Sequence, residues 1–209
     1  MSLAHRLSNT LPTDLPNLFH PWACRCPHES GSGAKGRLAH LERHLDCDAQ
    51  LVLVGEACGY QGCRYSGIPF TSERLLLEGA IPRVEPLQAR LSARKLPFSE
   101  PSATIVWKTL FQLGLAEHTV LWNALPLHPH RTDNPWSNRP PTDQELDLGA
   151  EALDLVIRHY PRAAIVAVGR KAELALGRLG IGAHAAVRHP ANGGAGAFAA
   201  GLKEISKNL

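Results

Sequence analysis

The chain has 209 residues, of which 44% are hydrophobic, enough for one ordinary globular domain with a full core. Its 22 Lys and Arg against 19 Asp and Glu give a net charge of +3. This charge permits nucleic-acid binding through a local basic patch, whereas a protein that coats DNA would usually be more basic. No apolar run approaches the roughly 18 residues of a membrane-spanning helix, and residues 1–15 lack the apolar core of a signal peptide. We therefore expect a cytoplasmic protein without membrane contact.

The chain begins with a segment rich in Pro, Gly, His and Cys, in which we expect one helix over 35–45. We interpret residues 1–50 as an N-terminal extension packed on a single domain that spans 1–209. Beyond residue 50, apolar runs typical of buried strands alternate with helical patterns. The expected strands are 51–54, 119–122, 164–168 and 185–187, and the expected helices are 72–78, 104–113, 143–159 and 170–179.

This alternation predicts an α/β fold, a three-layer α/β/α sandwich whose four-stranded parallel sheet is covered by helices on both faces. The Pro-rich stretch 125–141 is expected as a long loop, and long loops in compact domains often carry function. Polar residues follow all four strands, and in open parallel sheets ligands bind at the carboxyl ends of the strands. We therefore expect one crevice, lined by Gly55 and Glu56, Asn123, residues 169–171 and residues 188–190.

The most informative segment is the loop over residues 55–70, whose four glycines leave the backbone open to close approach by a ligand. Glu56 lies at the mouth of the expected crevice, which suits catalysis, although a helix cap or an ion pair would also explain an acid there. Phe70 ends the loop. It fits a stacking platform for a flat ligand and a plain core position equally well.

Asn123 and His189 follow the second and fourth expected strands. The Asn123 amide donates and accepts at once, as the edge of a nucleobase requires, whereas the alternative is that it satisfies loop backbone groups. His189 precedes Pro190 and the polar turn of Asn192 and Gly193, which is too polar and flexible for core. We therefore interpret His189 as functional rather than as a structural hydrogen-bonding histidine.

The five cysteines are an odd number in an expected reducing compartment, which disfavours a disulfide framework. Cys24 and Cys26 are separated by one residue, fewer than the two to four typical of structural zinc sites. We expect no metal and no cofactor. A metal-dependent nucleotide hydrolase that uses the N-terminal Cys and His residues remains an alternative.

Four motifs follow one another over residues 51–201, and they begin at Gly55, Phe70, Asn123 and His189. In this order, at the strand ends, they resemble the motifs of the uracil-DNA glycosylase superfamily. The first motif is most similar to the branch that reads Gly-Glu-Ala-Pro-Gly, whose thermophilic members carry a four-iron cluster. Here Cys58 replaces the proline, and Leu127 stands where that branch has a ligand cysteine, so the chain resembles a cluster-free bacterial relative. The motifs are Gly55-Glu56-Ala57-Cys58-Gly59, Phe70, Asn123 and His189-Pro190-Ala191-Asn192-Gly193-Gly194.

The resemblance implies a DNA repair glycosylase that flips out uracil and excises it hydrolytically, leaving an abasic site, with other deaminated bases as an open question. It implies a monomer that acts on uracil-containing or abasic DNA in the bacterial nucleoid. The implied catalytic residues are Glu56 and His189. The implied base-binding residues are Gly55, Ala57, Tyr60, Phe70 and Asn123, and the implied DNA-binding residues are Arg64, Arg139, Arg188, Asn192 and Gly193.

Two departures from the superfamily pattern keep a second function open. Ala57 stands where the best-known members have an aspartate that positions water, so Glu56 would hold the water or the bond would break dissociatively. Ala191 and Gly193 lie where many members carry a leucine that wedges into the duplex. The alternative is a protein that binds uracil or abasic sites with little turnover.

Overall fold

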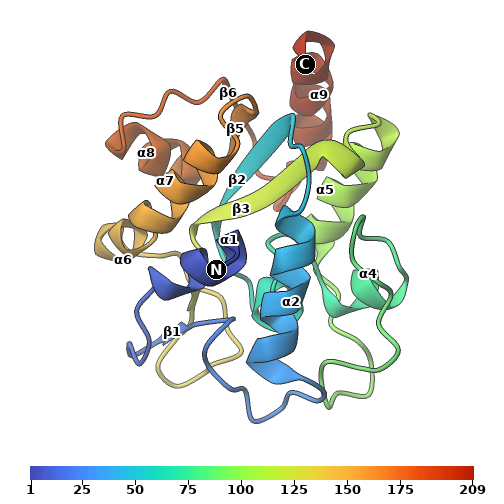
Figure 1. Cartoon of the computed structure of the whole chain (residues 1–209), viewed down its shortest axis with the longest axis vertical. Helices are drawn as coiled ribbons and strands as arrows, with labels where there is room; N and C mark the ends of the chain where they lie inside the picture. Colours follow the sequence, from blue (N-terminus) through green and yellow to red (C-terminus); the bar gives the residue numbers. More distant parts are fainter.

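The computed structural model describes residues 1–209, and a four-stranded parallel sheet of order β3-β2-β5-β6 lies at its centre (Figure 1). The predicted α/β fold is confirmed. All four strands are where the sequence predicts them, but two are longer, because the polar residues that follow their apolar cores still pair with a neighbour. The strands are β2 (Leu51–Ala57), β3 (Thr119–Leu125), β5 (Ala164–Val168) and β6 (Ala185–Val187).

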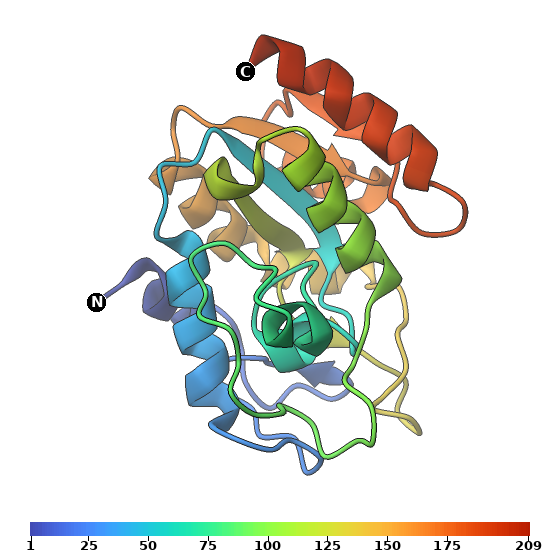
Figure 2. The same cartoon turned by 90° about the vertical axis from the view of Figure 1, so that its right-hand side faces the viewer.

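Alternate residues of the strands face two separate cores, as expected for a sheet with helices on both sides. Val52 and Val54 of β2 belong to one core, whereas Leu51 and Leu53 belong to the other. All four side chains are fully buried. Helices α1 (Leu3–Asn9), α2 (Gly33–Leu45), α6 (Asp143–Leu148), α7 (Ala150–His159) and α8 (Arg170–Arg178) contribute to the first core, and α4 (Glu73–Leu77), α5 (Pro101–Gln112) and α9 (Ala195–Ile205) contribute to the second (Figure 2).

The expected helix over 143–159 is two helices, because the chain breaks at Gly149. A side chain at Gly149 would overlap the backbone carbonyl of Ala124, so only glycine lets the helix pair pack this closely on β3. Helix α6 starts with a capping box in which Thr142 and Glu145 satisfy each other's backbone N–H. Helices α1 and α9 and the short elements α3 (Cys63–Ser66), η1 (Ala116–His118), η2 (Ser206–Asn208), β1 (Leu18–Phe19) and β4 (His128–Pro129) were not expected.

The N-terminal segment packs directly against the Gly-rich loop that follows β2. The Trp22 indole donates to the Gly67 carbonyl (3.0 Å) and stacks on Trp122 of β3, with ring centroids 5.8 Å apart. His40 of α2 bonds the Ser66 carbonyl at 2.8 Å. The first fifty residues therefore help to hold the loop in place. No helix of the structure has the length and apolar character needed to span a membrane.

Candidate functional site

Gly55 lies at the carboxyl end of β2, between the ring of Phe70 and the side chain of Asn123. A Cβ at this position would lie 2.5 Å from the Phe70 ring and 2.6 Å from the Asn123 amide. Asn123 reaches it because Gly55 and Asn123 are paired in the β2–β3 register. Only glycine fits here, and its bare backbone brings an aromatic ring and an amide together at the strand ends.

Phe70 is held in a strained conformation. Its φ of +50° lies in the left-handed region, which costs a non-glycine residue about 1–3 kcal/mol and is common at ligand sites. The side chain is only 7% exposed, and its ring centroid lies 5.9 Å from that of His189, with the planes inclined by 35°. The aromatic residue of the second motif and the histidine of the last one are therefore neighbours.

The Asn123 side chain is 2% exposed and bonds to the loop after β2. With the amide oriented to satisfy both of its ends, its nitrogen donates to the Trp122 carbonyl (3.2 Å) and its oxygen accepts from the Cys58 N–H (3.3 Å). The amide thereby joins β3 to the Gly-rich loop. These contacts match the alternative in which the amide satisfies backbone groups, and recognition of a nucleobase edge by Asn123 stays a prediction.

His189 has its ring orientation and its proton position set by the loop that follows it. The Ala191 N–H donates to His189 Nδ1 (3.1 Å), so the proton of the neutral ring is on Nε2. Burial lowers the pKa of His189 below its ordinary value of 6.5, because it disfavours the charged form. Around neutral pH the residue is a neutral imidazole that offers one N–H donor.

Glycines and left-handed residues shape the His189 loop. A Cβ at Gly194 would overlap the His189 carbonyl, and one at Gly169 (φ +90°) would lie 3.4 Å from the His189 Cβ. Asn192 and Gly193 both have positive φ, +52° and +76°, and both are exposed. The loop therefore turns sharply away from His189 and presents these two residues to solvent.

A cavity of about 650 Å³ opens beside this loop and brings two candidate residues, Glu56 and His189, into one space. Burial raises the pKa of the Glu56 carboxyl, and the nearby charge of Lys171 opposes that shift. The carboxyl makes no hydrogen bond within the protein, so both its oxygens are open to a ligand. The cavity is lined by Glu56, Gly169, Arg170, Glu173, Ala186, Val187, Arg188, His189, Ala191 and Asn192.

Arg64 and Arg139 are not placed to contact DNA. Arg64 is 3% exposed and donates to His128 Nδ1 (2.9 Å), so it has no surface with which to reach a phosphate. Arg139 forms a bidentate pair with Glu145 at 2.6 and 2.7 Å. Both arginines stabilise the 125–141 loop, Arg64 from inside the protein and Arg139 through Glu145, which occupies its guanidinium group although the Arg139 side chain is 24% exposed. Arg188, in contrast, is exposed at the cavity and donates to the Asn192 carbonyl (3.3 Å).

Ala57 and Tyr60 are the other two residues that were expected to bind the base. Ala57 ends β2 with a methyl group, so no carboxylate stands at that position. The Tyr60 ring points away from the Phe70 and His189 pair and packs against Phe98, with centroids 5.9 Å apart. Tyr60 therefore lines a different cavity from the one that contains Glu56.

Glu100, just before α5, is an acid that sequence reasoning missed. Its carboxyl lies against Gly59 and Gly62, and a Cβ at Gly59 would be 3.3 Å from Glu100 Oε1. Its Oε2 atom is buried without a hydrogen-bond partner, and burial raises the pKa of Glu100 to about 7. An acid before a proline at a helix start gives no sequence signal for such a contact, because the glycines lie about 40 positions earlier in the chain.

The cysteines do not form a ligand set for a metal cluster. No group of three or more His, Cys, Asp or Glu side chains is arranged to hold a metal ion. Cys58 and Cys63 are buried in the Gly-rich loop, and burial raises the pKa of the Cys63 thiol. The residues present do not fit a four-iron cluster.

Comparison with known proteins agrees with this geometry. The family model described as the uracil DNA glycosylase superfamily matches residues 42–198, which include every strand of the sheet and all four motifs. The chain therefore belongs to the uracil-DNA glycosylase superfamily.

A similar solved structure is that of wild-type SMUG2 from Pedobacter heparinus. The two chains are 16% identical, the TM-score is 0.66, and the match covers 100% of this chain and 98% of that one. At this identity the likeness shows the fold alone. No curated protein matches the chain.

Proposed function

We propose that the protein is a monofunctional uracil-DNA glycosylase, a cluster-free member of the branch with the Gly-Glu-Ala-Pro-Gly motif, acting as a monomer on bacterial DNA. The observation that carries this proposal is the fixed His189 tautomer, an N–H donor in a ring whose centroid lies 5.9 Å from that of Phe70. A flat base that stacks on this ring would meet the donor at its edge. Family membership and the Gly55–Asn123 contact support the same assignment.

In the proposed reaction the target nucleotide is flipped out of its strand, stacks on Phe70 and is read by the Asn123 amide. As the bond between C1′ and N1 breaks, its electron pair moves onto the base, and His189 donates a hydrogen bond to uracil O2. Stabilisation of such developing charge is often the largest catalytic contribution. Because Ala57 has no carboxylate, we infer a dissociative path in which Glu56 orients the water that adds to C1′, and the proton that this water loses neutralises the uracil anion.

The same proposal requires a movement at the base site. Phe70 and Asn123 are nearly fully buried, so a base enters only when the 66–71 segment shifts. The left-handed φ of Phe70 marks a strained segment of the kind found at ligand sites. The DNA backbone would contact the exposed end of the His189 loop, through Arg188, Asn192 and Gly193.

The experiment that tests this function is single-turnover base release from uracil-containing single- and double-stranded oligonucleotides, with wild type beside His189→Ser. Alkali-sensitive product from wild type, with a much slower mutant, supports the glycosylase. Ala57 and the absent leucine wedge motivate the second candidate, a damage-binding protein. Tight retention of uracil or abasic DNA without any product would select that candidate.

A further inference from the structure

A second cavity, of about 420 Å³, is lined in part by Tyr60 and Tyr65 of the Gly-rich loop. Its volume is within the range of about 300–1,000 Å³ typical of small-molecule sites. Four segments far apart in the sequence meet there, and none contributes a carboxylate to the lining. The lining residues are His28, Tyr60, Tyr65, Ala93, Arg94, Phe98 and Trp136.

Aromatic rings form the walls of this cavity. Tyr65 and Phe98 are buried and stack with centroids 4.5 Å apart, and the half-exposed Tyr60 meets the Phe98 ring edge-on. His28 and Trp136 also line the cavity, and their ring centroids lie 4.7 Å apart. Because Trp136 and Tyr60 are only partly covered, their rings are accessible to a flat ligand.

The cavity also carries a positive charge without a partner. Arg94 is exposed, makes no ion pair, and places its guanidinium carbon 4.5 Å from the Phe98 ring centroid. An arginine that stacks on an aromatic ring keeps its N–H groups available for a phosphate. Aromatic faces beside an unpaired arginine are the combination by which proteins bind single-stranded nucleic acid.

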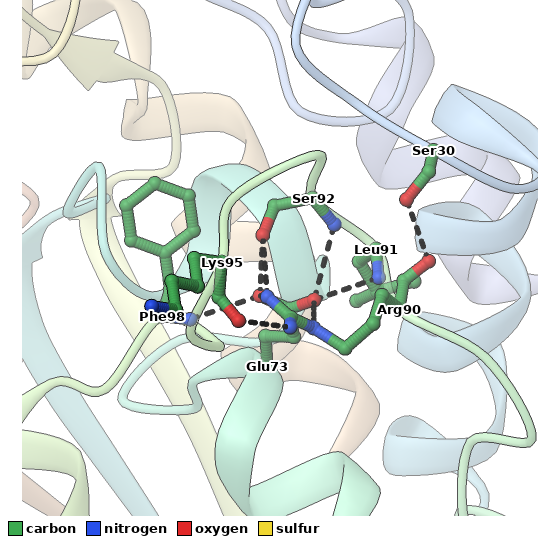
Figure 3. A network of polar contacts seen from close by, with 7 residues as sticks. All are labelled: Ser30, Glu73, Arg90, Leu91, Ser92, Lys95 and Phe98. Atoms are coloured by element: carbon green, nitrogen blue, oxygen red, sulfur yellow. Dashed lines mark hydrogen bonds and ion pairs between the residues drawn. The ribbon is translucent and has the colours of Figure 1, made fainter.

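The segment that carries Arg94 and Phe98 is held in place by the buried carboxylate of Glu73 (Figure 3). Glu73 pairs with Arg90 at 2.7 Å and accepts from the Phe98 N–H at 2.9 Å. It also accepts from the Leu91 N–H (2.8 Å) and from the Ser92 hydroxyl (2.7 Å). The cavity wall is therefore preorganised rather than a loose surface loop.

We propose that this aromatic cavity binds an unstacked base of the same DNA strand, near the flipped nucleotide, and so favours single-stranded or locally melted DNA. Continuity with the first site supports this assignment. Tyr60 is on the loop that begins with Gly55 and Glu56, and its backbone N–H donates to Asn138 Oδ1 (3.0 Å) of the Trp136 loop. The position of the bound base relative to uracil rests on the proposed glycosylase function, whereas binding to the cavity does not.

Trp136 provides a direct probe of binding. Trp22, Trp107 and Trp122 are at most 4% exposed, so Trp136 is the tryptophan that solvent and ligands reach. Titration of the full-length protein with a uracil-free oligothymidylate should quench the accessible emission, and Trp136→Phe should remove that response. A matched blunt duplex should quench little. Absence of quenching by the single strand would overturn the proposal.

Affinity measurements provide the second arm. Trp136→Ala and Arg94→Gln should each weaken single-strand binding, Trp136→Ala by about 5- to 100-fold from the loss of one stacked base. Arg94→Gln should also reduce the slope of log K against log salt by about 0.7. Arg162→Gln serves as the control, because Arg162 is an 85% exposed arginine at the amino end of β5 and does not line the cavity. Equal weakening by all three variants, or by none, would contradict a specific base site.

The two proposals fail in distinguishable ways. Single-strand binding and Trp136 quenching without any base release would support the proposed base-binding cavity and overturn the proposed glycosylase function. The wild type could instead release the base while Trp136→Ala and Arg94→Gln leave the single-strand affinity unchanged. That result would support the glycosylase function and overturn the base-binding cavity. A scan with a single abasic analogue placed at successive positions then maps the bound base, because the affinity falls only when that base is missing.

Discussion

The ring of Phe70 lies so close to Gly55 that a methyl group on Gly55 would be 2.5 Å from two of its carbon atoms. The same methyl group would lie 2.6 Å from the Asn123 amide. Glycine at the end of β2 is thus a condition for the stacking ring and the amide to meet at one point. This contact makes the site sensitive to a single added carbon.

Gly55→Ala should therefore destabilise the protein and impair base release together. Overpacking of a well-packed site typically costs about 1–3 kcal/mol in free energy of unfolding. Chemical denaturation and single-turnover kinetics measure the two effects. Gly177→Ala is the matched control, because Gly177 lies in α8 with no neighbour within 4 Å of a new Cβ, so that change should be neutral or slightly stabilising. Similar behaviour of the two variants would argue against the packing described for Gly55.

His189→Ser should slow the single-turnover rate about 100- to 1,000-fold, the cost of one lost donor to a developing negative charge. Binding of an abasic oligonucleotide should change far less. Because burial lowers the pKa of His189 below 6.5, the neutral ring persists above that value. The wild-type rate should stay flat from pH 6.5 upward for this group and change only as the ring protonates at lower pH. His159→Gln, in the exposed end of α7, should leave the rate unchanged.

Glu100 should make the stability of the folded protein depend on pH. Its folded pKa is raised to about 7 from an ordinary value of 4.5, so the folded state binds the proton more tightly than the unfolded state. The associated stability is present below about pH 4.5 and is lost as the pH rises through about 7. Glu100→Gln should therefore raise the melting temperature at pH 8 relative to wild type. Identical pH profiles of melting temperature would show that Glu100 is not buried as described.

Glu73→Gln should be among the more damaging single changes outside the base site. Burial alone would raise the pKa of Glu73, but hydrogen bonds from Arg90, Ser92 and the Phe98 backbone outweigh it and lower the pKa. Breaking such a buried charge network costs about 3–5 kcal/mol in free energy of unfolding. Glu78→Gln, which removes a partly exposed ion pair with Arg74, should cost less than about 1 kcal/mol. Urea denaturation of both variants measures the difference.

The sequence does not indicate the partners of several residues that the structure shows to be important. Nothing in the sequence around Glu73 indicates its role, because its partners come from residues 90–98, and an isolated acid in a short helix resembles a solvated one. The same holds for Arg64 and Arg139, which were expected at a DNA surface. Their carbonyl, histidine and carboxylate partners are brought to them only by the folded loop, and these partners occupy both guanidinium groups.

By itself, the sequence determined the sheet and the residues at its carboxyl edge. Continuous apolar runs such as 51–54 and 164–168 are buried on both faces, so their pattern identifies strands without further context. Asn123 and His189 follow such runs directly, and parallel strands necessarily bring their ends to one edge.

Tertiary structure decided what depends on close approach between distant segments. Gly201 lets the Gly-rich helix α9 pack against Val187, Gly149 divides α6 from α7, and the Tyr60 ring turns to Phe98. Such contacts depend on atoms far apart in the chain, and no local pattern of residues encodes them.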